Sequence, residues 1–109
     1  MFKIPKDNDK YSWTWHVVEK MKYYKLSPSR VKRVIRHPER TEQGVAEDTI
    51  ASMKVAKTKK RQEIWVMYQP AKKQGNSKIR IITAWRYPGE SPERDPVPKK
   101  ILKEVKSLI

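Results

Sequence analysis

Apolar residues recur at helical spacing near the start of the chain. From Tyr11 onward, Val18 and Met21 lie on one side of a helical wheel, and Ser12 or Thr14 offers a hydroxyl for the N-cap. The residues before Tyr11 are mostly polar. We therefore expect a polar N-terminal arm over residues 1–10, followed by a first helix.

A second helix is expected directly afterwards. Ser27 places an N-cap hydroxyl before Pro28 at the first helical position, and Pro38 must end the helix. Basic residues cover the side opposite its apolar stripe, which consists of Val31, Val34 and Ile35. Together the two segments predict a helical hairpin.

Beyond this hairpin the pattern changes to that of strands. Three segments are rich in β-branched and aromatic residues, and short basic loops at 58–62 and 70–78 join them. The strands are expected at 50–56, 63–69 and 79–87, with residues 40–46 as a further candidate for an edge strand. The expected fold class is α+β, with the helical hairpin packed on a three- or four-stranded antiparallel sheet.

The end of the chain is organised differently from this domain, which we place at residues 11–87. Residues 88–98 contain four of the eight prolines, which favours an extended connector. Pro98 can then open a helix over residues 99–109, with an apolar stripe formed by Ile101, Leu102, Val105, Leu108 and Ile109. The sequence leaves open whether this stripe docks on the same domain or on another protein.

The composition is strongly basic, with 26 Lys and Arg against 12 Asp and Glu and a formal net charge of +14 over 109 residues. Both halves contribute, since residues 1–54 carry 12 basic and 7 acidic groups and residues 55–109 carry 14 and 5. Four Trp and five Tyr favour a folded core. Such a charge is typical of proteins that bind polyanions, although it is also compatible with a role in solubility alone.

Several classes of function lack their sequence signals. The chain has no cysteine and only two histidines, His16 and His37, so disulfides and a zinc site made by the protein alone are not expected. It has no P-loop and no G-x-G-x-x-G, G-x-S-x-G or H-E-x-x-H motif. It also lacks a secretory signal and a membrane-spanning apolar run. We expect a cytoplasmic protein without a cofactor, a metal or a membrane partner.

One face of the first helix carries candidate catalytic groups. His16, Lys20 and Tyr23 follow one another at i, i+4 and i+7, opposite Val18 and Met21. Metal-independent RNA cleavage needs a base for the ribose 2′-OH, an acid for the leaving oxygen and cations for the phosphate. Histidine suits either proton transfer at neutral pH. The alternative is a solvated helix face without chemistry.

Basic and aromatic residues elsewhere predict a surface for nucleic acid. Strand alternation is expected to put Arg80 and Arg86 on one face of the last strand, where guanidinium groups could bind phosphate. Trp65 and Trp85 are expected in the core because their strands are strongly apolar. Further candidate contacts are Tyr23, Arg30, Arg33, Lys59, Lys60 and Arg61.

The segment HVVEKMKYYKLS (16–27), the basic helix after it and the late sequence IITAW (81–85) resemble a small, largely uncharacterised prokaryotic domain family. That family looks like part of the group of RelE, ParE and BrnT toxins, which share the fold of barnase-like and EndoU-like ribonucleases. The resemblance covers roughly residues 12–87. It aligns His16 with the family's helical His, Lys20 with its helical Arg and Thr83 with its late Thr, whereas Tyr24 replaces a frequent second Arg.

The resemblance and the residues together predict a toxin-like endoribonuclease that cleaves single-stranded RNA by transphosphorylation. His16 would be the general acid or base, Lys20 and Arg86 would bind the phosphate, and Arg80 and Thr83 would make accessory contacts. One alternative is a non-catalytic nucleic-acid-binding module on the same fold, with RNA favoured over DNA. Another is a scaffold whose final helix binds an acidic, antitoxin-like protein.

Overall fold

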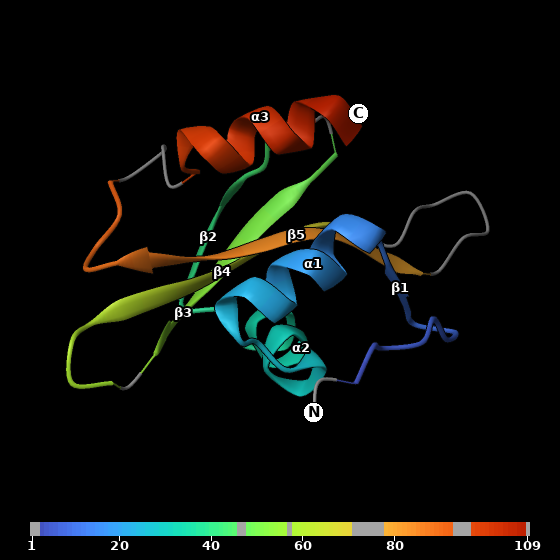
Figure 1. Cartoon of the computed structure of the whole chain (residues 1–109), viewed down its shortest axis with the longest axis horizontal. Coiled ribbons are helices and arrows are strands. Elements are labelled where there is room, and N and C mark those ends of the chain that lie inside the picture. The colour runs from blue at the N-terminus through green and yellow to red at the C-terminus, as the bar shows by residue number, and fades with distance from the viewer. Residues whose placement is uncertain (1–2, 46–47, 57, 71–77, 93–96, 109) are drawn as a thin grey trace.

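A computed structural model describes residues 3–45, 48–56, 58–70, 78–92 and 97–108, with side chains described as far as Val105 (Figure 1). The expected α+β class is confirmed. In chain order the elements are β1 (Tyr11–Trp13), α1 (Trp15–Tyr24), α2 (Pro28–Arg36), β2 (Arg40–Gln43), β3 (Ile50–Ala56), β4 (Gln62–Gln69), β5 (Ile79–Pro88) and α3 (Lys99–Leu108). Most of the expected loop 70–78 lies outside the described residues. No helix in the described ranges is long and apolar enough to cross a membrane.

The sheet has five strands in the order β1-β5-β4-β3-β2. β1 runs parallel to β5, and the other neighbouring strands are antiparallel. The prediction of a three- or four-stranded antiparallel sheet was therefore wrong in the number of strands and in the direction of one edge strand. The edge strand expected within residues 40–46 is present as β2, at the edge opposite β1.

β1 occupies residues that the sequence assigned to the start of the first helix. The side chains of Tyr11 and Trp13 are both buried, with Ser12 between them only partly so, which is the two-residue period of a strand. The N–H of Ile79 in β5 donates to the carbonyl of Lys10 at 2.7 Å. A three-residue strand is thus stabilised by pairing with a segment far along the chain.

Both helices of the hairpin begin at hydroxyl caps that the sequence indicates. Thr14 Oγ1 accepts the N–H of Val17 at 3.1 Å and donates to the carbonyl of Ile82 at 2.7 Å, so the cap also ties α1 to β5. Ser27 Oγ accepts the N–H of Arg30 at 3.2 Å at the start of α2. These caps fix where the two helices begin relative to the sheet.

Each face of the sheet has its own apolar core. Side chains alternate along β4, so that Ile64 and Val66 pack with α1 and α2, whereas Trp65 and Met67 pack with α3. Trp65 stacks on Trp85 with 5.9 Å between ring centroids, and both rings are fully buried, as the sequence predicts. The two cores therefore lie on opposite faces of the sheet, and Tyr24 at the end of α1 packs against both of them.

The C-terminal helix docks on the sheet of its own chain. Ile101 and Val105 are 1% and 0% exposed and belong to the same apolar cluster as the stacked tryptophans. Leu102 is partly exposed, and the side chains of Leu108 and Ile109 lie outside the described residues. The sequence left open whether the apolar stripe docks on the same domain or on another protein. The described part of the stripe docks on its own domain.

A β-bulge in β5 alters the faces that strict alternation predicts. Met67 pairs with Thr83 but Tyr68 pairs with Ile81, which leaves Ile82 as an extra residue. Strict alternation from the start of β5 would assign each later side chain to a face of the sheet. Because of the extra residue, the side chains after the bulge lie on the opposite face from that assignment. As a correction to the sequence prediction, two arginines lie on opposite faces of the sheet: Arg80 and Arg86.

Candidate nucleic-acid interface

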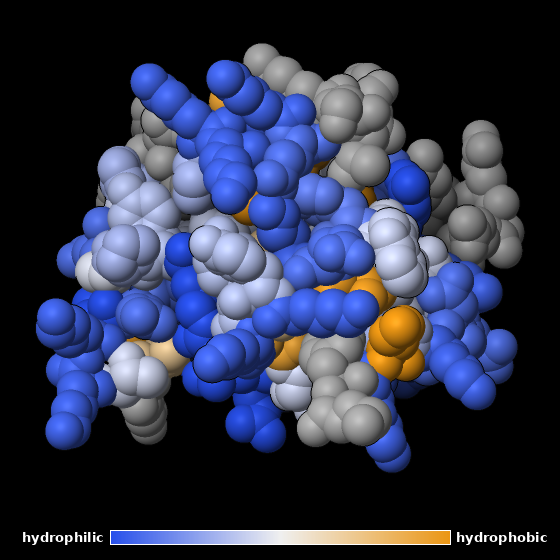
Figure 2. Space-filling view, in the orientation of Figure 1, coloured by the Kyte–Doolittle hydropathy of each residue, from blue (hydrophilic) through white to orange (hydrophobic). Residues whose placement is uncertain are grey.

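The outward side of α2 carries only basic ionisable groups. Val31 and Val34 are buried, which turns the polar positions of this nine-residue helix toward solvent. Figure 2 shows hydrophilic side chains over most of the face formed by the helices in the view of Figure 1. The basic residues of α2 are Arg30, Lys32, Arg33 and Arg36.

A cleft of about 440 Å³ lies beside this helix. Its lining combines basic, apolar and acidic side chains, contributed by Arg30, Arg33, Val34, Glu39, Lys54, Val55 and Ile64. Lys54 is held in place, because its ammonium group donates to the carbonyl of His37 at 3.2 Å and lies 3.7 Å from a carboxylate oxygen of Glu39. A second hollow of about 350 Å³ is lined by Ser29, Lys32, Arg33, Arg36 and His37.

Arg86 of β5 adds a fourth guanidinium to the three of α2, on the same face of the sheet. It is the register partner of Ile64, which lines the cleft. Its Nε donates to the carbonyl of Tyr24 at 2.8 Å and its Nη1 to Gln62 Oε1 at 3.3 Å. Burial lowers the pKa of Arg86, and the positive charge of Arg30 lowers that pKa further. The two cations are therefore close enough to repel each other.

These groups form what we call the α2 basic surface, defined by Arg30, Lys32, Arg33, Arg36 and Arg86. Within the described part of the chain, no ion pair joins any of the five to a carboxylate. Phosphate oxygens would relieve the repulsion between the guanidinium groups and could accept two hydrogen bonds from each.

Of the remaining predicted contacts, Thr83 and Arg80 do not belong to this surface. Tyr23 is 69% exposed on α1, whereas Thr83 is fully buried and out of reach of a surface ligand. Arg80 is exposed on the opposite face of the sheet from Arg86. The connection between β3 and β4 holds three exposed basic residues, Lys59, Lys60 and Arg61.

The predicted catalytic pair on α1 lies under the C-terminal helix. Lys20 Nζ is 2.7 Å from Glu104 Oε2, and His16 Nε2 is 3.4 Å from the same oxygen. The side chains of His16 and Lys20 are only 15% and 11% exposed. The face of α1 that carries His16 and Lys20 was expected to lie in solvent, opposite Val18 and Met21. It is instead a buried contact between α1 and α3.

The environment of His16 favours its neutral form. Burial lowers the pKa of His16; the carboxylate of Glu104 raises it and the ammonium of Lys20 lowers it, and the balance is a lowered pKa. A neutral imidazole beside a carboxylate and an ammonium group could accept a proton. Glu104 was not predicted, although it is the only acidic residue in the C-terminal segment 99–109.

The three predicted catalytic residues are not assembled at one point. His16 is in the first turn of α1, and Arg86 binds the carbonyl of Tyr24 in its last turn. Eight residues of helix separate His16 from Tyr24, or about 12 Å along the axis. Among the residues described, no group of three or more His, Asp or Glu side chains is placed to hold a metal ion.

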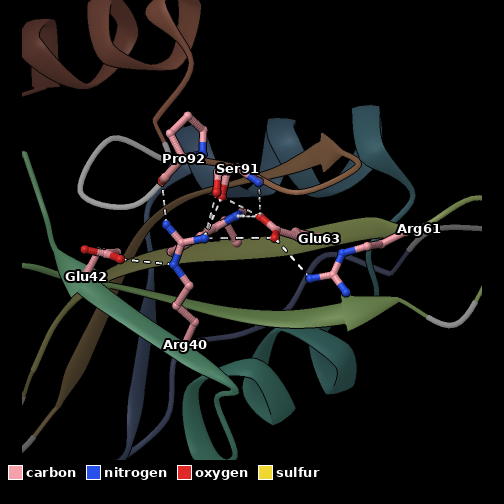
Figure 3. A network of polar contacts seen from close by, with 7 residues as sticks. Arg40, Glu42, Arg61, Glu63, Ser91 and Pro92 are labelled. Atoms are coloured by element: carbon pink, nitrogen blue, oxygen red, sulfur yellow. Dashed lines mark hydrogen bonds and ion pairs between the residues drawn. The ribbon is translucent and has the colours of Figure 1, made fainter.

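A different polar cluster lies on the α3 side of the sheet and holds the start of the connector (Figure 3). Glu63 is completely buried and accepts hydrogen bonds from Trp65 Nε1 at 2.9 Å and from Ser91 Oγ at 2.5 Å. Arg40 donates to the carbonyl and hydroxyl of Ser91 at 3.0 Å each and to the carbonyl of Pro92 at 2.6 Å.

We call this cluster the Glu63 network and define it by Arg40, Glu63, Trp65 and Ser91. Its contacts hold parts of the fold together. Burial raises the pKa of Glu63, but hydrogen bonds from Ser91 and Trp65 and the charge of Arg40 outweigh burial and hold the pKa below its ordinary value. Arg40 also lies 5.0 Å from the ring centroid of Trp65. Oε1 of the buried carboxylate is thus hydrogen-bonded from within the fold, whereas Oε2 accepts no hydrogen bond from a residue that the structure describes and has two cationic neighbours, Arg61 at 3.5 Å and Arg40 at 4.0 Å. The cations of the α2 basic surface, by contrast, have no carboxylate partner among the described residues.

Comparisons with known proteins give no relative for this chain. No family model, no curated protein and no solved structure matches it.

Proposed function

We propose that this chain is a nucleic-acid-binding protein that prefers RNA and binds the phosphate backbone through the α2 basic surface. The observation that carries the proposal is the cluster of guanidinium groups from α2 and β5 without carboxylate partners in the described residues. A net charge of +14 adds long-range attraction for any polyanion. The preference for RNA comes from the resemblance to RelE-like domains.

The test is the affinity for a fluorescently labelled 20-nucleotide RNA, measured by anisotropy at several salt concentrations. Arg30→Ala with Arg33→Ala is expected to weaken binding by about tenfold or more at low salt. It should also flatten the plot of log affinity against log salt by about 0.7 for each phosphate of the single strand that the protein no longer neutralises.

A matched control removes the same charge from another part of the surface. Lys99→Ala with Lys103→Ala also deletes two exposed cations, but from α3 on the other face of the sheet. It should change the affinity by less than about threefold. Equal losses from both double variants would show that net charge alone drives binding and would remove the α2 basic surface from the proposal.

A second candidate function is RNA cleavage at His16, and the convergence of His16, Lys20 and Glu104 favours it. In this scheme His16, neutral near pH 7, accepts the proton of the ribose 2′-OH, and the 2′-oxygen attacks the adjacent phosphorus. The bond between phosphorus and the 5′-oxygen breaks, the 5′-oxygen takes a proton from water, and a 2′,3′-cyclic phosphate results. Lys20 supplies positive charge, and Glu104 orients both groups.

Cleavage is tested with labelled RNA in EDTA, comparing the wild type with His16→Gln. Loss of cleavage in the variant, with RNA affinity unchanged, supports a proton-transfer role for His16. Intact RNA in the presence of wild-type protein at concentrations that saturate binding would instead leave a binding protein without ribonuclease activity.

A further inference from the structure

Two large aromatic side chains stand exposed on the solvent side of α1. Trp15 is 66% exposed and Tyr23 is 69% exposed, whereas the other three tryptophans of the chain, Trp13, Trp65 and Trp85, are buried. Eight residues separate Trp15 from Tyr23, which places the two rings about 12 Å apart along the helix axis.

Both rings are flanked by ammonium groups. Lys22 Nζ lies 5.8 Å from the ring centroid of Trp15. Tyr23 has two such neighbours, Lys20 at 5.8 Å on its own helix and Lys100 at 5.6 Å on α3. Tyr24 packs edge-on against the ring of Tyr23 with 4.8 Å between centroids, which holds that ring in one orientation.

The aromatic pair continues the α2 basic surface. Tyr24, the residue after Tyr23, accepts a hydrogen bond at its carbonyl from the guanidinium of Arg86, so the end of α1 that carries Tyr23 adjoins this arginine of the α2 basic surface. A strand of nucleic acid crossing Arg86 would therefore meet an aromatic ring next. Base pairs in a duplex are already stacked inside the helix, whereas unpaired bases are free to stack on protein rings.

We infer that Trp15 and Tyr23 form a stacking platform for the unpaired bases of single-stranded RNA, with Lys22 and Lys100 close to the phosphates on either side. This inference rests on the proposed function and gives it a substrate class. The α2 basic surface attracts any polyanion, and the two rings select single strands over duplexes. Neither ring reads base identity, because every base presents a π-face.

The experiment compares a single-stranded uridine-rich RNA with a blunt-ended duplex RNA of equal length, using anisotropy for affinity and tryptophan fluorescence as a local probe. Trp15 is the exposed tryptophan, so quenching of its emission reports stacking at the platform. Trp15→Ala and Tyr23→Ala are each expected to weaken binding of the single strand by about tenfold and to leave duplex binding unchanged. Tyr23→Phe should retain wild-type affinity because the ring remains.

Ile4→Ala is the matched control, since Ile4 is 51% exposed and not aromatic; its affinity should equal that of the wild type. Thermal melting checks that all variants fold.

Unchanged single-strand affinity in both alanine variants, while Arg30→Ala with Arg33→Ala still weakens binding, would overturn the platform and leave the proposed function standing. Equal quenching by polyglutamate of matched charge would overturn it as well. No binding of either RNA by the wild type would overturn both proposals.

Discussion

Glu63→Ala is expected to lower the free energy of unfolding by about 3–5 kcal/mol, because it removes one partner of a buried charge network. Arg40 would keep its bonds to the carbonyls of Ser91 and Pro92 but would lose the nearest buried carboxylate, which lies 4.0 Å away. Trp65 Nε1 would be left in the core without its acceptor. Urea denaturation followed by circular dichroism measures the loss.

The neighbouring carboxylate provides the control. Glu42 also binds Arg40, with 3.0 Å between Oε2 and Nε, but it lies at the edge of the sheet in β2, and its side chain is 19% exposed. Glu42→Ala should cost about 1 kcal/mol or less. Glu63→Gln should cost less than Glu63→Ala, since an amide oxygen still accepts hydrogen bonds from Ser91 and Trp65. A loss below about 1 kcal/mol for Glu63→Ala would show that the network contributes little.

The same network predicts the pH dependence of stability. The pKa of Glu63 is held below its ordinary value in the folded state, so the folded state binds this proton more weakly than the unfolded chain does. Its contribution is present above the unfolded value of about 4.3 and is lost as pH falls through the folded pKa. Denaturation at pH steps from about 7 to 3 should show a loss of stability in the wild type that is smaller in Glu63→Gln.

Local signals in the sequence were sufficient for most of the secondary structure. The Ser27-Pro28 pair marks the start of α2, and the three strands rich in β-branched and aromatic residues are present within one or two residues of their expected bounds. These signals succeed because capping and strand propensity depend on neighbouring residues. They also locate the buried Trp65 and Trp85.

Features that depend on distant pairing were missed. β1 is stabilised by β5, about 68 residues away, and a three-residue strand leaves too short a pattern to separate it from the helix that follows. The bulge at Ile82 arises from the register between β4 and β5, so alternation within β5 alone could not reveal it. That single extra residue decides which arginine of β5 lies beside α2.

The candidate site was predicted in its composition but not in its arrangement. The sequence indicates that basic residues of α2 face solvent, because the apolar stripe of this helix is clear. It does not show that α3 covers His16 and Lys20, since that contact depends on Glu104, 84 residues beyond Lys20. A polar helix face has the same pattern whether water or another helix lies against it.

Ile101→Ala is expected to lower the free energy of unfolding by about 2–5 kcal/mol, the range for large-to-small substitutions in a core. Ile101 is 1% exposed and packs in the cluster that contains the Trp65–Trp85 stack. Leu102→Ala is the control on the next position, because that side chain is partly exposed and should cost less. Denaturation is measured by tryptophan fluorescence, which reports global unfolding and the exposure of the stacked rings of Trp65 and Trp85 to water.

The size of this loss also decides how an acidic, antitoxin-like partner could bind. If Ile101→Ala is destabilising and shifts tryptophan emission to longer wavelength, the apolar stripe of α3 is occupied within the chain. A partner could then use the stripe only by first displacing α3, at a cost equal to the stability that the helix contributes. A change below about 0.5 kcal/mol would contradict docking of α3 on its own sheet and would leave the stripe available to a partner. Under the expected result, such a partner would bind the basic surface and leave α3 in place.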